Sequence, residues 1–171
     1  PLAILCLLPF AACSAGGDPV PDAGEVAGPS KSVTVGESGG VLEVEGLRLT
    51  LPAGAIAAGT ELTVRVTDEV PAIEGVTPLT PVFEFGPDGT SFAQEVFLAF
   101  DVQPATDEIP VLFWTNADGV YEAQPGWLLD GKLHALATHF SKGLIGSSKT
   151  ATLPTYCCGG GTCGTRGVCN T

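Results

Sequence analysis

Between Lys31 and Ile145 the chain consists of short runs in which apolar and polar residues alternate. These runs are KSVTV, VLEVEGLRLTL, ELTVRVTD, PVFEFGP, EVFLAFDV, VLFWTN and KLHALATHF. Successive side chains of a strand point to opposite faces of a sheet, so each run predicts a strand with one buried and one solvated face. A chain with this period along most of its length is expected to bury its core between sheets.

Turn signals separate the runs at the spacing of an antiparallel sandwich. They are Gly39-Gly40, Pro52-Ala53-Gly54, Pro87-Asp88-Gly89, Asp118-Gly119 and Asp130-Gly131. The segment LPAGAIAAGT allows at most one helical turn, because Gly54 and Gly59 weaken anything longer. The sequence therefore predicts an all-β fold, an antiparallel β-sandwich over residues 31–145.

Charge limits the classes of partner. The 171 residues include 19 acidic and 7 basic side chains, which gives a formal charge of −12. A chain this acidic repels nucleic acids and anionic head groups, so we expect no nucleic-acid partner. Metalloprotease, P-loop and dinucleotide-binding signatures do not occur in the sequence, and we expect no cofactor and no metal.

The first residues, PLAILCLLPFAAC, form an uncharged apolar run with the length of a signal-peptide core. The run ends in Phe10-Ala11-Ala12-Cys13, which resembles the lipobox of bacterial lipoproteins. That resemblance implies that residues 1–13 are part of a signal peptide and that Cys13 becomes a lipidated N-terminus. It also implies a location at the bacterial outer membrane or cell surface. The alternative is an ordinary secretory signal and an unmodified thiol.

Composition divides the rest of the chain. Residues 14–30 combine Gly, Pro, Ala and acids, which is typical of a solvated, disordered linker. Residues 146–171 are interpreted as a second linker and a cysteine-rich tail. The tail cysteines are Cys157, Cys158, Cys163 and Cys169. An even set in an exported protein predicts two disulfides of undetermined connectivity; a tetrathiolate zinc site is the alternative, although paired C-x-x-C motifs are missing.

Three motifs together resemble the ZU-five domain of zonula occludens proteins, Unc-five netrin receptors, ankyrins and bacterial surface proteins. They are Gly39-Gly40, the segment from Leu47 to Ile56 with LPAGA, and the segment from Phe85 to Phe92 with GPDGTSF, followed by Val96. The resemblance covers about residues 32–145. It implies a β-sandwich that serves as a module for contacts with a protein partner, which the sequence does not identify.

His139-Phe140-Ser141 resembles the self-cleavage site of death-domain signalling proteins that contain this domain. The resemblance implies that the Ser141 hydroxyl attacks the Phe140 carbonyl, with His139 as general base. The alternative interpretation is structural. In that case the triplet is the end of the last strand, with Phe140 in the core and Ser141 at the strand end.

Other polar and aromatic residues are weaker candidates. Asp88, Asp118 and Asp130 each precede glycine, and hairpin turns are a better interpretation than calcium ligands. Trp114 and Trp127 could form a carbohydrate platform if they were exposed, but buried sandwich aromatics are expected more often. His134 is interpreted as a solvated strand residue.

These observations favour a surface lipoprotein with a structural or protein-binding domain and no catalytic turnover. Self-cleavage at Phe140–Ser141 and a carbohydrate-binding adhesin are the alternatives.

Overall fold

The computed structural model describes residues 28–105 and 108–148, and these form strands and turns without a helix. The strands are β1 (Ser30–Thr34), β2 (Gly40–Val44), β3 (Leu47–Leu51), β4 (Glu61–Thr67), β5 (Thr77–Pro78), β6 (Val82–Gly86), β7 (Ser91–Asp101), β8 (Ile109–Thr115), β9 (Tyr121–Gln124), β10 (Gly126–Leu129), β11 (Lys132–His139) and β12 (Lys142–Ser148). They run from Ser30 to Ser148, so β12 extends past the expected limit at Ile145.

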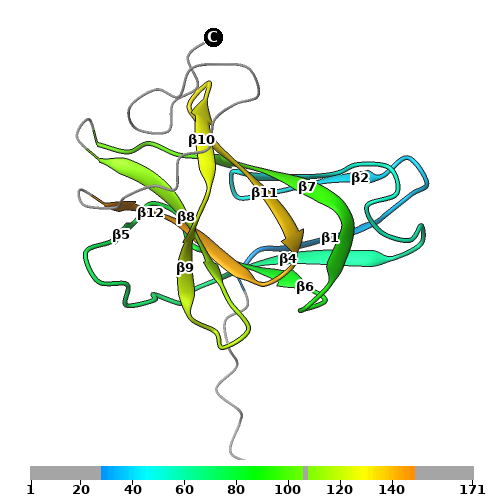
Figure 1. Ribbon diagram of the computed structural model, residues 1–171, viewed down its shortest axis with the longest axis horizontal. Coiled ribbons are helices and arrows are strands. Elements are labelled where there is room, and N and C mark those ends of the chain that lie inside the picture. Colours follow the sequence, from blue (N-terminus) through cyan, green and yellow to red (C-terminus); the bar gives the residue numbers. More distant parts are fainter. Residues whose placement is uncertain (1–27, 106–107, 149–171) are drawn as a thin grey trace, which may run out of the picture.

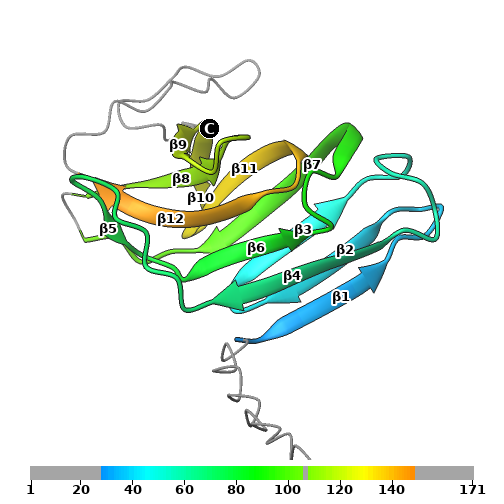
Figure 2. The ribbon, with the colours of Figure 1, turned by 90° about the horizontal axis from the view of Figure 1, so that it is seen from below.

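The strands form two antiparallel sheets that pack as a sandwich. The seven-stranded sheet has the order β1-β4-β6-β12-β8-β9, with β5 also paired to β12, and the five-stranded sheet has the order β10-β11-β7-β3-β2. Figure 2 shows β1, β4 and β6 in front of β2 and β3, and Figure 1 shows β9 continuing into β10. The predicted all-β antiparallel sandwich is confirmed.

Alternation places the core between the sheets. In β4 the side chains of Leu62, Val64 and Val66 are buried while their neighbours are exposed or half-buried, and β3 shows the same pattern. From β6, Phe83 and Phe85 enter the core, where the ring of Phe83 lies 5.6 Å from that of Phe100. The period-two runs of the sequence are therefore the inward faces of the sandwich.

Part of the outward side of the seven-stranded sheet is also covered. Val82, Val111, Phe113 and Leu144 form a second apolar cluster, against which Ile73 and Val76 pack. Ile73 and Val76 lie in the segment 68–81, which is here called the covering loop. Backbone N–H groups of Leu79 and Thr80 donate to the carbonyl of Ile145, at 2.8 and 3.2 Å. The loop therefore stays on β12 through main-chain bonds as well as apolar contacts.

Two glycines let the covering loop and the core approach β12 from opposite sides. A Cβ atom on Gly143 would overlap the indole of Trp114, with Cζ3 at 2.7 Å. A Cβ atom on Gly146 would overlap Val76 and lie 3.2 Å from Cε2 of Phe113. Because protein interiors are close-packed, neither ring has space to retreat into without displacing others.

The motifs that resemble the ZU-five domain form turns at strand ends. Gly39 has a φ of 88°, and a Cβ atom there would lie 2.9 Å from the carbonyl carbon of Pro52. In the LPAGA segment, Gly54 has a φ of 77° and the N–H of Ala55 donates to the Pro52 carbonyl at 3.2 Å. Positive φ and close backbone approach both favour glycine, which explains its presence at these two positions.

Candidate functional site

The triplet His139-Phe140-Ser141 carries the chain from one sheet to the other. β11 ends at His139 in the five-stranded sheet, and β12 begins at Lys142 in the seven-stranded sheet. The interpretation of this triplet as the end of the last strand is therefore wrong, because β12 follows it. The sequence KGLIGSS forms that strand by pairing with β8 along Gly143–Ser148 and with β6 at Lys142 and Gly143.

Phe140 lies in the core, as the structural interpretation of the triplet predicted. It is 1% exposed, and its ring centroid lies 5.3 Å from that of Phe85 and 4.8 Å from that of Phe92. Its backbone N–H donates to the carbonyl of Thr90 at 2.7 Å. Thr90 and Phe92 belong to the GPDGTSF motif, so this motif positions the crossover between the sheets.

The hydroxyl of Ser141 pairs with the hydroxyl of Thr115, which is only 6% exposed. Thr115 Oγ1 also accepts the backbone N–H of Lys142 at 3.1 Å, and the Ser141 carbonyl accepts the N–H of Phe85 at 3.1 Å. The side chain of His139 is exposed, and among the described residues no hydrogen bond joins it to Ser141. The geometry thus places a hydroxyl, and not the imidazole, beside the predicted nucleophile.

Ser141 lines a polar cleft of about 300 Å³, here called the Ser141 cleft. Its lining includes Glu69, Glu84, Thr115, Tyr121, Ser141 and Lys142. Glu69 accepts hydrogen bonds from Lys142 Nζ at 3.0 Å and from the Tyr121 hydroxyl at 3.1 Å. Lys142 Nζ also lies 3.8 Å from a Glu84 carboxylate oxygen. Ion pairs and hydrogen bonds within the cleft therefore satisfy most of its polar groups.

These contacts determine the protonation of Lys142. The hydrogen bond to Glu69, assisted by the charges of Glu69 and Glu84, raises the pKa of Lys142 above its usual value. Its ammonium group therefore stays protonated near neutral pH and has no lone pair with which to deprotonate Ser141. Lys142 is therefore not available as a base for that serine, and no hydrogen bond among the described residues joins His139 to it.

The surroundings of Tyr121 favour its protonated form. Burial, followed by the charge of Glu69, raises the pKa of Tyr121 above 10.0. Above about pH 10 the unfolded chain releases the Tyr121 proton, whereas the folded domain still holds it. The contribution of Tyr121 to the stability of the folded domain is therefore complete below about pH 10 and is lost as pH rises through the folded-state pKa. We expect Glu69→Gln to lower the pKa of Tyr121 part of the way, because burial remains.

The measurement is an ultraviolet titration of tyrosinate absorbance in a Tyr156→Phe background, which leaves Tyr121 as the chain's single tyrosine. Ionisation of Tyr121 at an unshifted pKa in the folded protein would contradict the contact with Glu69.

The other sequence-predicted residues are dispersed. Asp88, Asp118 and Asp130 lie in turns, as expected, and no three acidic, histidine or cysteine side chains of the described residues are grouped as a metal site would require. Trp114 is 4% exposed and lies in the core, so it cannot form a sugar platform. The half-buried Trp127 stacks on His134 with ring centroids 5.6 Å apart, an arrangement that the sequence did not predict for His134.

The face of the five-stranded sheet that points away from the core is here called the outer face. A row of uncharged side chains crosses it from β11 to β2, because Leu136 pairs with Phe97, Phe97 with Thr50 and Thr50 with Val41. Phe97 is 50% exposed and Val41 is 46% exposed. We name this set of four side chains the uncharged row. No functional role for it followed from the sequence, although Phe97 in EVFLAFDV and Val41 already occupied outward positions of their runs.

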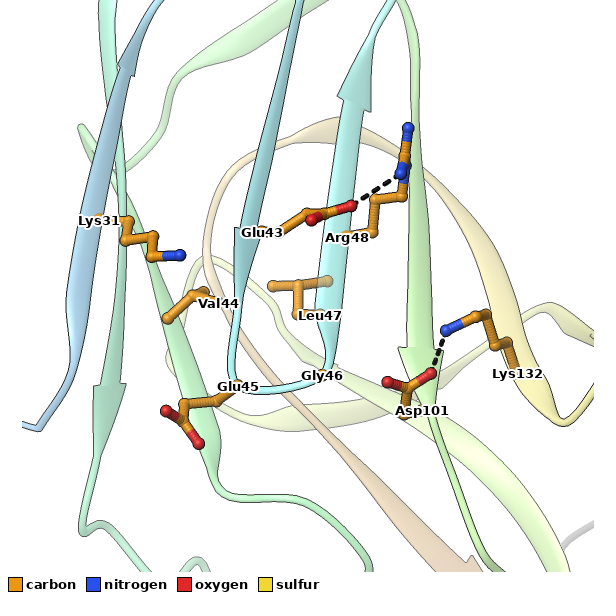
Figure 3. A pocket seen from close by; sticks show the side chains of 9 residues that line it. All are labelled: Lys31, Glu43, Val44, Glu45, Gly46, Leu47, Arg48, Asp101 and Lys132. Carbon is orange, nitrogen blue, oxygen red and sulfur yellow. Dashed lines mark hydrogen bonds and ion pairs between the residues drawn. The ribbon is translucent and has the colours of Figure 1, made fainter.

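Charged side chains border the outer face at one end. Figure 3 shows a cleft around the turn between β2 and β3, with a volume of about 390 Å³, into which Lys31 points from β1. Arg48 Nη1 lies 2.7 Å from Glu43 Oε1, and Lys132 pairs with Asp101 (Figure 3). Opposite charges are thus paired along this border of the sheet.

Several sequence predictions fall outside the described residues. These are the lipidation of Cys13 and the disulfides of Cys157, Cys158, Cys163 and Cys169. In the part of the chain that the structure describes, no helix is both long and apolar enough to cross a bilayer.

Comparison with known proteins supports part of the resemblance. No curated protein matches the chain. The family model of the ZU5 domain, the ZU-five domain named above, matches residues 31–108. The matched range includes all three motifs and ends before β8, so it does not include Ser141. An all-β sandwich with this match is consistent with a ZU5 domain, which suggests a protein-interaction or structural role.

Proposed function

We propose that this chain is a bacterial surface lipoprotein whose ZU5-type sandwich acts through contacts with protein and does not turn over a substrate. A lipid on Cys13 would hold it at the outer membrane or cell surface, and residues 14–30 would separate the sandwich from the anchor. The order of Ala11, Ala12 and Cys13 supports the anchor, and the four tail cysteines support an oxidising compartment. Several acyl chains on one residue would give stable membrane attachment.

The observation that carries the contact function is the uncharged row on the outer face. Exposed hydrophobic side chains that gather on one face of a soluble domain are typical of an interaction site, whereas isolated ones are ordinary. Phe97 and Val41 lie on that face with half of each side chain open to solvent, although the core between the sheets is already filled by other residues. We therefore assign the outer face as the contact surface.

Self-cleavage at Phe140–Ser141 remains the second candidate, because Ser141 lines an open cleft. The reaction needs a base within hydrogen-bond distance of the Ser141 hydroxyl. Thr115 occupies that place and Lys142 is held by Glu69, so the geometry favours an uncleaved chain.

A sugar-binding adhesin would have to use Trp127, which is the indole outside the core. The stacked His134 covers one face of that ring.

Intact-mass spectrometry of protein extracted from the membrane of the producing cell tests these possibilities together. We expect one uncut species that begins at Cys13, is heavier by its acyl groups and is lighter by two hydrogens for each disulfide. Cys13→Ser should remove the acyl mass and release the protein from the membrane. Unacylated wild-type protein would refute the anchor. Two fragments that disappear in Ser141→Ala would instead establish self-cleavage.

A further inference from the structure

The outer face differs from the rest of the surface in its hydrophobic side chains. Five large hydrophobic residues are exposed in the described part of the chain, and three of them lie on the outer face: Val41, Phe97 and Leu129. The other two are separated from them, since Val70 belongs to the covering loop and Val120 to the turn between β8 and β9. Phe97 sits on β7, the central strand in the order β10-β11-β7-β3-β2.

The outer face also differs in charge. The whole chain has a formal charge of −12. On the outer face, Arg48 pairs with Glu43 and Lys132 pairs with Asp101. Glu95 is then the one outward charge of β7 without an oppositely charged partner among the described contacts. The face is therefore nearly neutral on a strongly acidic protein.

The apolar part of the opposite surface of the sandwich is covered. The covering loop lies over β8 and β12, and Val111, Phe113 and Leu144 are 6% exposed or less beneath it. On the same side of that sheet, β1 and β4 are open but present polar side chains such as Ser32, Thr63 and Arg65. The outer face is consequently the open sheet surface that carries large hydrophobic side chains among the described residues.

We propose that the outer face binds the outer face of a second copy of this chain. Two molecules with a charge of −12 repel each other in most orientations. The electrostatic repulsion is smallest when they approach through their nearly neutral faces. A twofold contact brings the same patch of both copies together, so a central uncharged row packs against itself. Paired charges of both signs then border that contact, as Figure 3 shows for one copy.

The size of the face predicts a weak dimer. The sheet has five strands about 4.8 Å apart, and its outward residues extend over about 17 Å along each strand. The flat area of the face is therefore roughly 400 Å², without the additional surface of the protruding side chains. Stable interfaces bury about 800 Å² from each partner. We therefore expect association in the micromolar range, which attachment to one membrane would favour by raising the local concentration. This inference deepens the proposed contact function by naming its partner.

Sedimentation velocity of the full chain over a concentration series tests the proposal. We expect wild type to shift from monomer to dimer between about 1 and 100 μM. Phe97→Glu places a charge in the uncharged row and should raise the dissociation constant at least tenfold. Val120→Glu is the matched control, since Val120 is 56% exposed and lies away from the outer face. It should leave the dissociation constant unchanged.

Circular dichroism and thermal unfolding of each variant show that the fold is retained, which is expected because both side chains point outward. A wild-type chain that stays monomeric through 100 μM would overturn the proposal, and so would equal weakening by the two variants. A monomer that binds another protein or a neutral glycan through Phe97 would also overturn it. That last result would contradict the dimer but remain compatible with the proposed contact function. An unacylated mass would contradict the lipid anchor but remain compatible with the dimer.

Discussion

We expect Phe140→Ala to lower the free energy of unfolding by about 3–5 kcal/mol, which is the range for a buried phenylalanine replaced by alanine. Phe140 is 1% exposed and contacts the rings of Phe85 and Phe92. Its removal leaves a cavity where the chain crosses between the sheets, and the N–H of residue 140 is bonded to the Thr90 carbonyl, which restricts collapse around it. The melting temperature should fall by roughly 10–20 °C.

Chemical denaturation followed by tryptophan fluorescence measures this change. Phe97→Ala is the matched control, because it removes the same side chain from a half-exposed position; its cost should stay below about 1 kcal/mol. Similar losses in the two variants would show that Phe140 does not occupy the core. The experiment also bears on self-cleavage, since a nick beside so central a residue would have to leave its ring in place for the fragments to remain associated.

Gly143→Ala should destabilise the domain by about 2–3 kcal/mol, near the upper range for overpacking a core. The added methyl overlaps the indole of Trp114 and lies 3.2 Å from the Phe113 carbonyl oxygen. Both neighbours belong to β8, which pairs with β12 at this point, so the Phe113 carbonyl cannot withdraw without disturbing the sheet. The buried indole can move only by displacing its own neighbours in the core. Equilibrium unfolding of the variant measures the loss.

A second substitution identifies its cause. Trp114→Leu removes the ring that the methyl meets, so the double variant should lose less stability than the sum of the two single changes. Gly36→Ala is the control, because the nearest atom to its added methyl would be 3.6 Å away. Its effect should stay within about 0.5 kcal/mol. Strict additivity at positions 143 and 114 would contradict the predicted overlap.

Much of the fold could be predicted because its signal is local. Val64, Val66, Phe83 and Phe85 stand at alternate positions of their runs, and the structure buries all four. The run VLEVEGLRLTL is divided into β2 and β3 by a turn in which Glu45 has a φ of 44° and Gly46 a φ of 77°. Glutamate is uncommon at positive φ, so the sequence did not mark this hairpin.

The strands that the sequence missed lack alternation. In β9 and β10 the side chains are half-buried or exposed, with no regular period. β12 contains Gly143 and Gly146, which weaken a strand prediction but are required by the side chains packed against them. A strand of this kind is determined by its neighbours across the sheets and not by its own residues.

The Ser141 cleft depends on such distant neighbours as well. The contact between Thr115 and Ser141 joins residues 26 positions apart, and that between Glu69 and Lys142 joins residues 73 positions apart. Residue types identified Ser141 and His139 as candidates, but only the register of β8 and β12 shows that threonine faces the serine. The same holds for the outer face, where three strands must be aligned before Val41 and Phe97 fall in one row.

The position of β12 between β6 and β8 has a consequence for the order of folding. A chain delivered across a membrane from its N-terminus presents β1, β4 and β6 first and β8 later, yet these halves of the sheet have no hydrogen bonds to one another until residues 142–148 arrive between them. In a chain delivered in this way, the seven-stranded sheet would be completed only when its last strand, residues 142–148, arrives between β6 and β8.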